Sequence, residues 1–170
     1  MAYATGLDIK IGLHRRLAPS LVQDFYPDGM PEDWRNNFLV MLTQAIWVRG
    51  DDADLSDVLA AIVGAPKPVL TVWEAAAESS KARQDWQCAY PEQSLIVLSP
   101  DAPIWSPDNG VVGARVGLIP ASDQPALLRI WLEAFAAQAP AHMCAVFIEG
   151  DNPSVATLDR VQTLLELLGW

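Results

Sequence analysis

Charged and aromatic side chains follow the apolar segments of this chain, and they are the residues whose types and spacing could do chemistry. In folds built from parallel strands, the carboxyl ends of the strands meet at one edge, and ligands bind there. Carboxylates that converge at such an edge could hold a divalent cation or divide into an acid and a base. The residues at these positions are Arg49, Asp51, Trp73, Glu74, Ser99, Asp101, Glu149 and Asp151.

Glu74 and Glu149 are the predicted catalytic carboxylates, because each directly follows an apolar segment. His14 follows the first such segment and is the predicted general base, since an unperturbed imidazole titrates near neutral pH. The alternative for the carboxylates is an exposed or arginine-paired position in a loop. The alternative for His14 is a solvated loop histidine beside Arg15.

Arg49, Asp51, Trp73 and Asp151 are the predicted ligand-binding residues at the same edge. The two aspartates have a second interpretation, because aspartate is favoured as the N-cap of a helix and each stands shortly before a helical pattern. The sequence names no particular metal, cofactor or substrate.

The elements that would position these residues alternate between strands and helices. Period-two or continuous apolar patterns predict strands, and apolar residues at i, i+3, i+4 and i+7 predict helices. This pattern indicates one α/β domain over residues 1–170, with about six mostly parallel strands forming a shortened TIM-like barrel or an open α/β sheet. Strands are expected at 7–13, 45–48, 69–73, 95–98, 111–119 and 143–148. Helices are expected from 31 to near 43, at 54–62, within 75–91, from 122 or 123 to 135, and at 153–168, and residues 18–25 are expected to form a short helix or a turn.

Two helices have apolar rows that the sequence predicts to face the core. In the helix that opens at Pro31, the row is Trp34, Phe38 and Met41, with Leu42 beside them. In the helix after residue 122, the inward residues are expected to be Leu127, Ile130, Trp131, Ala134 and Phe135.

Seven tryptophans occur in the chain, and two of them have no obvious place in the core. Trp105 lies in a proline-rich segment expected to be the longest loop, and Trp170 is the last residue of the sequence. Tryptophan is enriched at protein interfaces, so both are candidates for an interface. Packing against the protein's own surface is the alternative.

Residues 45–55 and 145–155 match position by position in residue type. AIWVRGDDADL and AVFIEGDNPSV each have an apolar segment, a charged residue, Gly-Asp, a candidate cap and the start of a helix. The match indicates either common loop chemistry between a strand and a helix or a βα unit repeated by duplication.

The stretch from Phe25 to Val48 resembles the start of the family called domain of unknown function seventy-two. The similarity lies in Phe25-Tyr26-Pro27, Trp34, Phe38 and the apolar segment that follows. The resemblance covers about the first third of the chain, and it implies a TIM-like β/α fold and no established activity. The family's strand carries a glutamate, whereas this chain has Gln44-Ala45-Ile46-Trp47 without a carboxylate.

The composition excludes several classes of partner. The chain has 21 acidic and 11 basic residues, a net charge of −10, so nucleic acid and anionic membranes are disfavoured. No apolar run long enough to span a bilayer and no signal peptide is found in the sequence. Its two cysteines lack the spacing of a metal site, and a cytoplasmic location is expected.

Two function classes follow from these observations. A non-catalytic binding or assembly protein is favoured, because no catalytic motif is found and two tryptophans lack a core position. The alternative is a small-molecule enzyme, metal-assisted, that uses the strand-end carboxylates. An incomplete barrel would leave sheet edges and apolar surface to cover, so a homodimer is also expected.

Overall fold

The computed structural model describes residues 6–75, 80–140, 142–150 and 153–170. It confirms an α/β fold with seven strands in the described residues, and every strand pairing is parallel. The strands are β1 (Asp8–Leu13), β2 (Ala45–Arg49), β3 (Leu70–Glu74), β4 (Leu95–Leu98), β5 (Ile104–Trp105), β6 (Val116–Pro120) and β7 (Met143–Glu149). The helices are α1 (Pro19–Asp24), α2 (Glu32–Leu42), α3 (Leu55–Val63), α4 (Ser80–Ala89), α5 (Pro125–Gln138) and α6 (Val155–Leu168).

The strands form two sheets, and the chain groups into two compact units that each contain one sheet. Unit 1 consists of Met1–Tyr26 and Pro103–Trp170, with the strand order β1-β7-β6-β5. Unit 2 is Pro27–Ala102, with the order β2-β3-β4. A closed barrel needs one continuous ladder, whereas the described strands form two open sheets. The expectation of a single domain stays a prediction.

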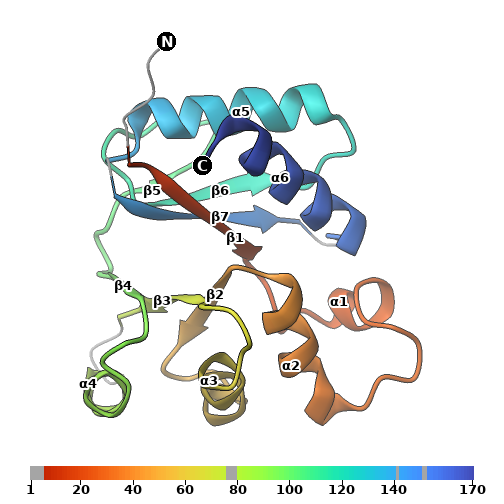
Figure 1. Cartoon of the computed structure of the whole chain (residues 1–170), viewed down its shortest axis with the longest axis vertical. Helices are drawn as coiled ribbons and strands as arrows, with labels where there is room; N and C mark the ends of the chain where they lie inside the picture. The colour runs from red at the N-terminus through yellow and green to blue at the C-terminus, as the bar shows by residue number, and fades with distance from the viewer. Residues whose placement is uncertain (1–5, 76–79, 141, 151–152) are drawn as a thin grey trace. The chain divides into compact units, whose positions relative to one another are not determined.

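Unit 1 joins the two ends of the chain in one sheet. β1 and β7 run in register from Asp8 beside Met143 to Leu13 beside Ile148. Helices α5 and α6 lie on one side of this sheet (Figure 1). A close approach explains Gly117 of β6, because a Cβ there would lie 3.0 Å from two ring carbons of Phe135 in α5.

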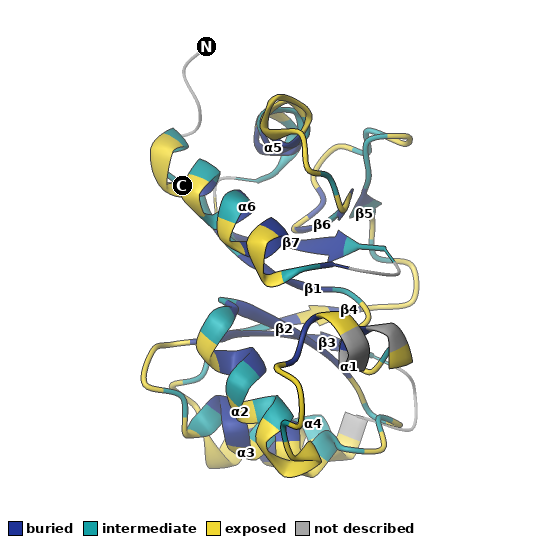
Figure 2. Ribbon diagram, turned by 90° about the vertical axis from the view of Figure 1, so that its right-hand side faces the viewer, coloured by how far each residue is buried: buried dark blue, intermediate teal, exposed yellow. Residues whose placement is uncertain are grey.

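Unit 2 is a contiguous segment with β3 in the middle of its sheet. Helices α2, α3 and α4 lie together on one side of the sheet (Figure 2). Trp73 of β3 and Trp86 of α4 are both buried, and their ring centroids lie 6.1 Å apart. This aromatic contact packs α4 against the sheet.

The predicted inward row of α2 is wrong. Trp34 is 63% exposed and Met41 is 67% exposed, whereas Leu39 and Val40 are buried. The helix turns toward the core the side that carries Leu39 and Val40 near its carboxyl end. The two largest exposed side chains of the helix, Trp34 and Met41, therefore lie at the surface.

The prediction for α5 is wrong by about one position. Ile130 is 57% exposed and Leu127 lies at the surface, while Leu128 and Leu132 are fully buried. Phe135 is buried, as expected. Leucines at 127, 128 and 132 allow two overlapping stripes, and the packing against the sheet selects the second.

Trp105 is a core residue, so its assignment to an interface is wrong. It forms β5 together with Ile104, is 2% exposed, and its ring centroid lies 5.5 Å from that of Phe135. The expected long loop therefore contains a short strand. The next strand also begins later than expected, at Val116, and a turn precedes it.

Candidate functional site

The strand ends of unit 2 hold an ion pair. Arg49 ends β2 and Glu74 ends β3, and the parallel register places these two residues side by side. The Arg49 Nε–H donates to Glu74 Oε2 at 2.8 Å, and the Trp47 Nε1–H donates to the same oxygen at 3.0 Å. The predicted catalytic carboxylate is thus bound by two donors, one of them a cation, and this arrangement suits orientation better than proton abstraction.

The loop after β2 places its aspartates in different roles. Asp52 Oδ2 accepts from the backbone N–H of Arg49 at 2.9 Å. Asp54 occupies the N-cap position of α3, but its carboxylate accepts from Asn36 Nδ2 at 2.8 Å and makes no cap hydrogen bond. Asp51 is exposed in the turn and is not the cap of α3.

Trp73 lies away from the Arg49–Glu74 pair. Successive residues of a strand point to opposite faces, so Trp73 and Glu74 are on opposite faces of β3. Trp73 is 0% exposed and faces α4. The structure brings Arg49 and Glu74 together and separates Trp73 from them.

The strand ends of unit 1 bring together His14 and Glu149, two of the predicted catalytic residues. The backbone N–H of His14 donates to the carbonyl of Ile148 at 3.1 Å, which continues the β1–β7 ladder by one residue. His14 Nδ1 then lies 3.8 Å from Glu149 Oε1. The imidazole is 17% exposed and the carboxylate 46% exposed, so the pair lies at the surface of the strand ends.

Gly150 allows the chain to turn directly after Glu149. It has φ of 150°, which side chains rarely adopt, and a Cβ there would lie 3.5 Å from Cβ of Ala121. Ala121 in turn donates its backbone N–H to the carbonyl of Glu149 at 2.9 Å. The backbone of Glu149 and Gly150 thus lies against Ala121, the residue that follows β6. Asp151, a predicted ligand-binding residue, lies outside the described residues.

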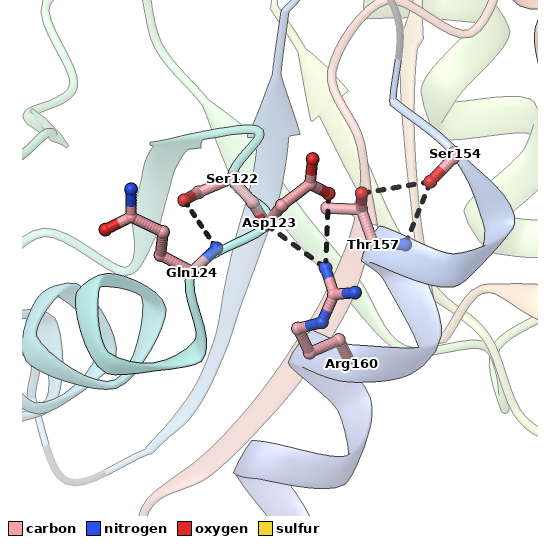
Figure 3. Close-up of polar contacts among 6 residues, drawn as sticks. All are labelled: Ser122, Asp123, Gln124, Ser154, Thr157 and Arg160. Carbon is pink, nitrogen blue, oxygen red and sulfur yellow. Dashed lines mark hydrogen bonds and ion pairs between the residues drawn. The ribbon is translucent and has the colours of Figure 1, made fainter.

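A set of polar contacts joins the starts of α5 and α6 beside this corner (Figure 3). Ser154 caps α6, with its Oγ accepting from the Thr157 N–H at 3.1 Å. Arg160 Nη1 lies 3.4 Å from Asp123 Oδ1 and 3.4 Å from the carbonyl oxygen of Ser122. Nothing in the sequence pairs Arg160 with residues 122–123, because the contact depends on how α6 lies beside the end of β6.

The described residues contain no group of three or more histidine, cysteine, aspartate or glutamate side chains placed to hold a metal ion. Similarly, none of the helices in the described ranges has the length and apolarity needed to cross a membrane.

The two corners differ in what they could do chemically. The Arg49–Glu74 pair is neutral overall and well oriented, as in a structural ion pair or a positioning group. A carboxylate beside an imidazole is the arrangement that orients a histidine for proton transfer. Of the predicted catalytic groups, His14 and Glu149 therefore have the geometry closest to that of an acid–base pair.

Comparison of the chain with family models, with curated proteins and with solved structures finds no match. The resemblance of the first third to domain of unknown function seventy-two therefore stays a prediction.

Proposed function

We propose that this chain is a binding or assembly protein that docks a protein partner on helix α2. The observation that supports the proposal is an exposed apolar row, here called the α2 face and made up of Trp34, Phe38 and Met41. Residues spaced by four and three lie on one side of a helix. Trp34 and Met41 are each more than three-fifths exposed, and Phe38 lies between them partly buried.

An exposed row of large apolar side chains is typical of a protein interaction site. Tryptophan carries a large share of binding energy in interfaces, and methionine adapts its shape to different partners. Keeping Trp34 in water has no benefit for folding, since burial of a side chain of this size is favourable. A binding role gives a reason for its position.

Selection of peptides tests this proposal. A displayed library of helical peptides is selected on the wild-type protein and counter-selected on Trp34→Ala/Met41→Ala. We expect enriched peptides that bind the wild type and the control Ile130→Ala/Leu167→Ala equally, because Ile130 and Leu167 are exposed apolar residues in unit 1. Failure to enrich any peptide that distinguishes the two double variants would contradict the proposal.

The second candidate function is a small-molecule enzyme, metal-assisted, at the His14–Glu149 pair. The approach of these two side chains to 3.8 Å at the ends of neighbouring parallel strands favours it. A metal that binds the folded state raises the melting temperature by mass action. The test scans Mg²⁺, Mn²⁺, Ca²⁺ and Zn²⁺ on the wild type, Glu149→Gln and the matched control Glu74→Gln.

For this second candidate we expect a rise in melting temperature that Glu149→Gln abolishes and Glu74→Gln retains. The absence of a rise with all four metals would end the metal-assisted version. A rise that survives in Glu149→Gln would place the metal elsewhere.

Two further parts of the proposal concern partners and place. We propose a cytoplasmic protein that binds neither nucleic acid nor anionic membranes, since its net charge of −10 repels both. We also propose a homodimer that covers sheet edges. Size-exclusion chromatography with light scattering tests the dimer, and the mass of a monomer would exclude it.

A further inference from the structure

The helix that carries the α2 face has an acidic start. Asp28 lies in the turn before α2, and Glu32 and Asp33 form its first turn. All three are exposed, and none makes an ion pair within the part of the chain that the structure describes. These carboxylates give the start of α2 a negative charge, one turn or less from Trp34 along the helix axis.

The other end of the α2 face has no compensating positive charge. The sequence of α2 is EDWRNNFLVML, so Arg35 is its only basic residue, and its last turn has none. The carboxyl end of a helix also carries the negative end of the helix dipole. The carboxyl end of α2 therefore has no basic side chain, and Arg35 is the single cation set against Glu32 and Asp33 in the helix.

Resting on the proposed binding role, we infer that the occupant of the α2 face is a basic amphipathic helical segment of another protein. Its apolar residues would pack on Trp34, Phe38 and Met41, and its lysines or arginines would meet Asp28, Glu32 and Asp33. An amphipathic helix presents apolar anchors at the same spacing as the α2 face. A cation placed over the indole of Trp34 adds a cation–π attraction.

Charge makes a second copy of this chain an unsuitable occupant. In a two-fold dimer the same patch meets itself. If two α2 helices paired antiparallel, Glu32 and Asp33 of each would lie against the carboxyl end of the other, where the dipole is negative and no basic side chain occurs. If they paired parallel, the carboxylates would face one another. Both arrangements add repulsion to a chain of net charge −10.

The test uses two synthetic 14-residue helical probes with one pattern of leucines. One probe has lysine at every polar position, and the other has glutamate. Binding is followed by fluorescence anisotropy of the labelled probe at low and at physiological salt. We expect the lysine probe to bind the wild type and the glutamate probe to bind at least tenfold more weakly.

Two variants locate the site. Trp34→Ala/Met41→Ala keeps the charge and is expected to lower the affinity for the lysine probe at least tenfold. Asp28→Asn/Glu32→Gln/Asp33→Asn keeps the apolar row. This variant is expected to have a lower affinity for the lysine probe, and its affinity should change less between low and physiological salt. The controls, Ile130→Ala/Leu167→Ala and Asp101→Asn/Asp108→Asn, remove exposed apolar groups and exposed carboxylates elsewhere and should bind as the wild type does.

Several outcomes would overturn the inference. If the control variants lose as much affinity for the lysine probe as the two α2 variants do, the probe responds only to the net charge of the protein. If the glutamate probe binds the wild type as tightly as the lysine probe does, and Trp34→Ala/Met41→Ala abolishes this binding, the α2 face is a docking site but its occupant is not basic. A dimer in light scattering that Trp34→Ala converts to a monomer assigns the face to a second copy. Failure of both probes also rejects the inference, while the peptide selection above decides separately whether the face binds any partner.

Discussion

The corner from β2 to α3 and the corner from β7 to α6 have the same sequence pattern and different chemistry. Arg49 holds in the first corner the position that Glu149 holds in the second, each one residue before a Gly-Asp pair. Arg49 meets a carboxylate on the neighbouring strand at 2.8 Å, and Glu149 meets an imidazole at 3.8 Å. The chemistry of a strand end is therefore decided by what the adjacent strand supplies.

The two corners also differ in how the following helix begins. Ser154 caps α6 with its hydroxyl, whereas the carboxylate of Asp54 is bound to Asn36. Gly150 has a positive φ, and Gly50 is not among the positive-φ glycines of the described residues. Both corners do connect a strand to a helix, as the matching sequences predict, while an origin by duplication stays a prediction.

The largest expected effect tests whether the two units that carry these corners unfold together. Trp73→Ala in unit 2 and Phe135→Ala in unit 1 each remove a fully buried ring, and each is expected to cost about 3–5 kcal/mol of unfolding free energy. For a single domain, both variants shift one common urea transition, measured by circular dichroism and tryptophan fluorescence. Separate transitions in either variant would contradict a single domain.

The next effect tests the difference between the two corner glycines. Gly150→Ala places a Cβ at φ of 150°, so we expect a loss of about 1–3 kcal/mol of unfolding free energy. Gly50→Ala is the matched control and is expected to change stability by less than about 1 kcal/mol. Urea denaturation measures both variants. Equal losses would mean that the two corners have the same backbone requirement.

A smaller effect compares the cysteines of the two units. Burial raises the pKa of the Cys144 thiol in β7 from 9.0 to about 11, Asp8 adds to the rise, and the nearby Arg115 offsets part of it. Between pH 9 and 11 an unfolded thiol ionises while the folded one stays protonated, so folding stability falls as pH rises through this window. Between pH 9 and 11 the wild type should therefore lose about 1–2 kcal/mol more unfolding free energy than Cys144→Ala does.

Thiol labelling gives a second measurement of the same difference. The exposed Cys88 of α4 should react with iodoacetamide under native conditions, and the buried Cys144 should react only after unfolding. Native labelling of both thiols at the same rate would contradict the packing of β7.

The smallest effect concerns the two charge pairs themselves. Glu74→Gln removes an ion pair whose side chains are 54% and 39% exposed, so the expected loss is below about 1 kcal/mol and shrinks at high salt. Glu149→Gln breaks a longer contact and should cost still less. Thermal unfolding at low and high salt measures both, and a larger loss for Glu149→Gln would reverse the ranking of the two corners.

Most strands and helices were predictable from periodicity, because their patterns were long or bounded by glycine and proline. The strand from Ala45 and the helix from Leu55 lie within a few residues of the prediction. β5 was not predictable, since two residues carry no period. The inward faces of α2 and α5 were misassigned because apolar residues lie on more than one side of each helix, and the choice depends on contacts with the sheet.

The candidate site was predictable in its positions and less so in its partners. Residues at the carboxyl ends of strands were identified from sequence, and the structure pairs Arg49 with Glu74 and His14 with Glu149. The pairing of β2 with β3 brings Arg49 to Glu74, and the pairing of β1 with β7 brings His14 to Glu149. No local sequence pattern contains the information about which strands pair. The exposed α2 face was missed because Trp34 and Met41 were assigned to the core.

The pairing of β1 with β7 has a consequence for synthesis of the protein on the ribosome. Unit 2 is contiguous and can assemble as soon as Ala102 has left the exit tunnel. The partner strand of β1 follows the whole of unit 2 in the chain, so the apolar residues Ile9 and Ile11 must wait until unit 2 and β7 have been made. Pairings between distant segments slow folding and leave strands open to aggregation, so a chaperone that shields the nascent β1 would raise the yield of native protein.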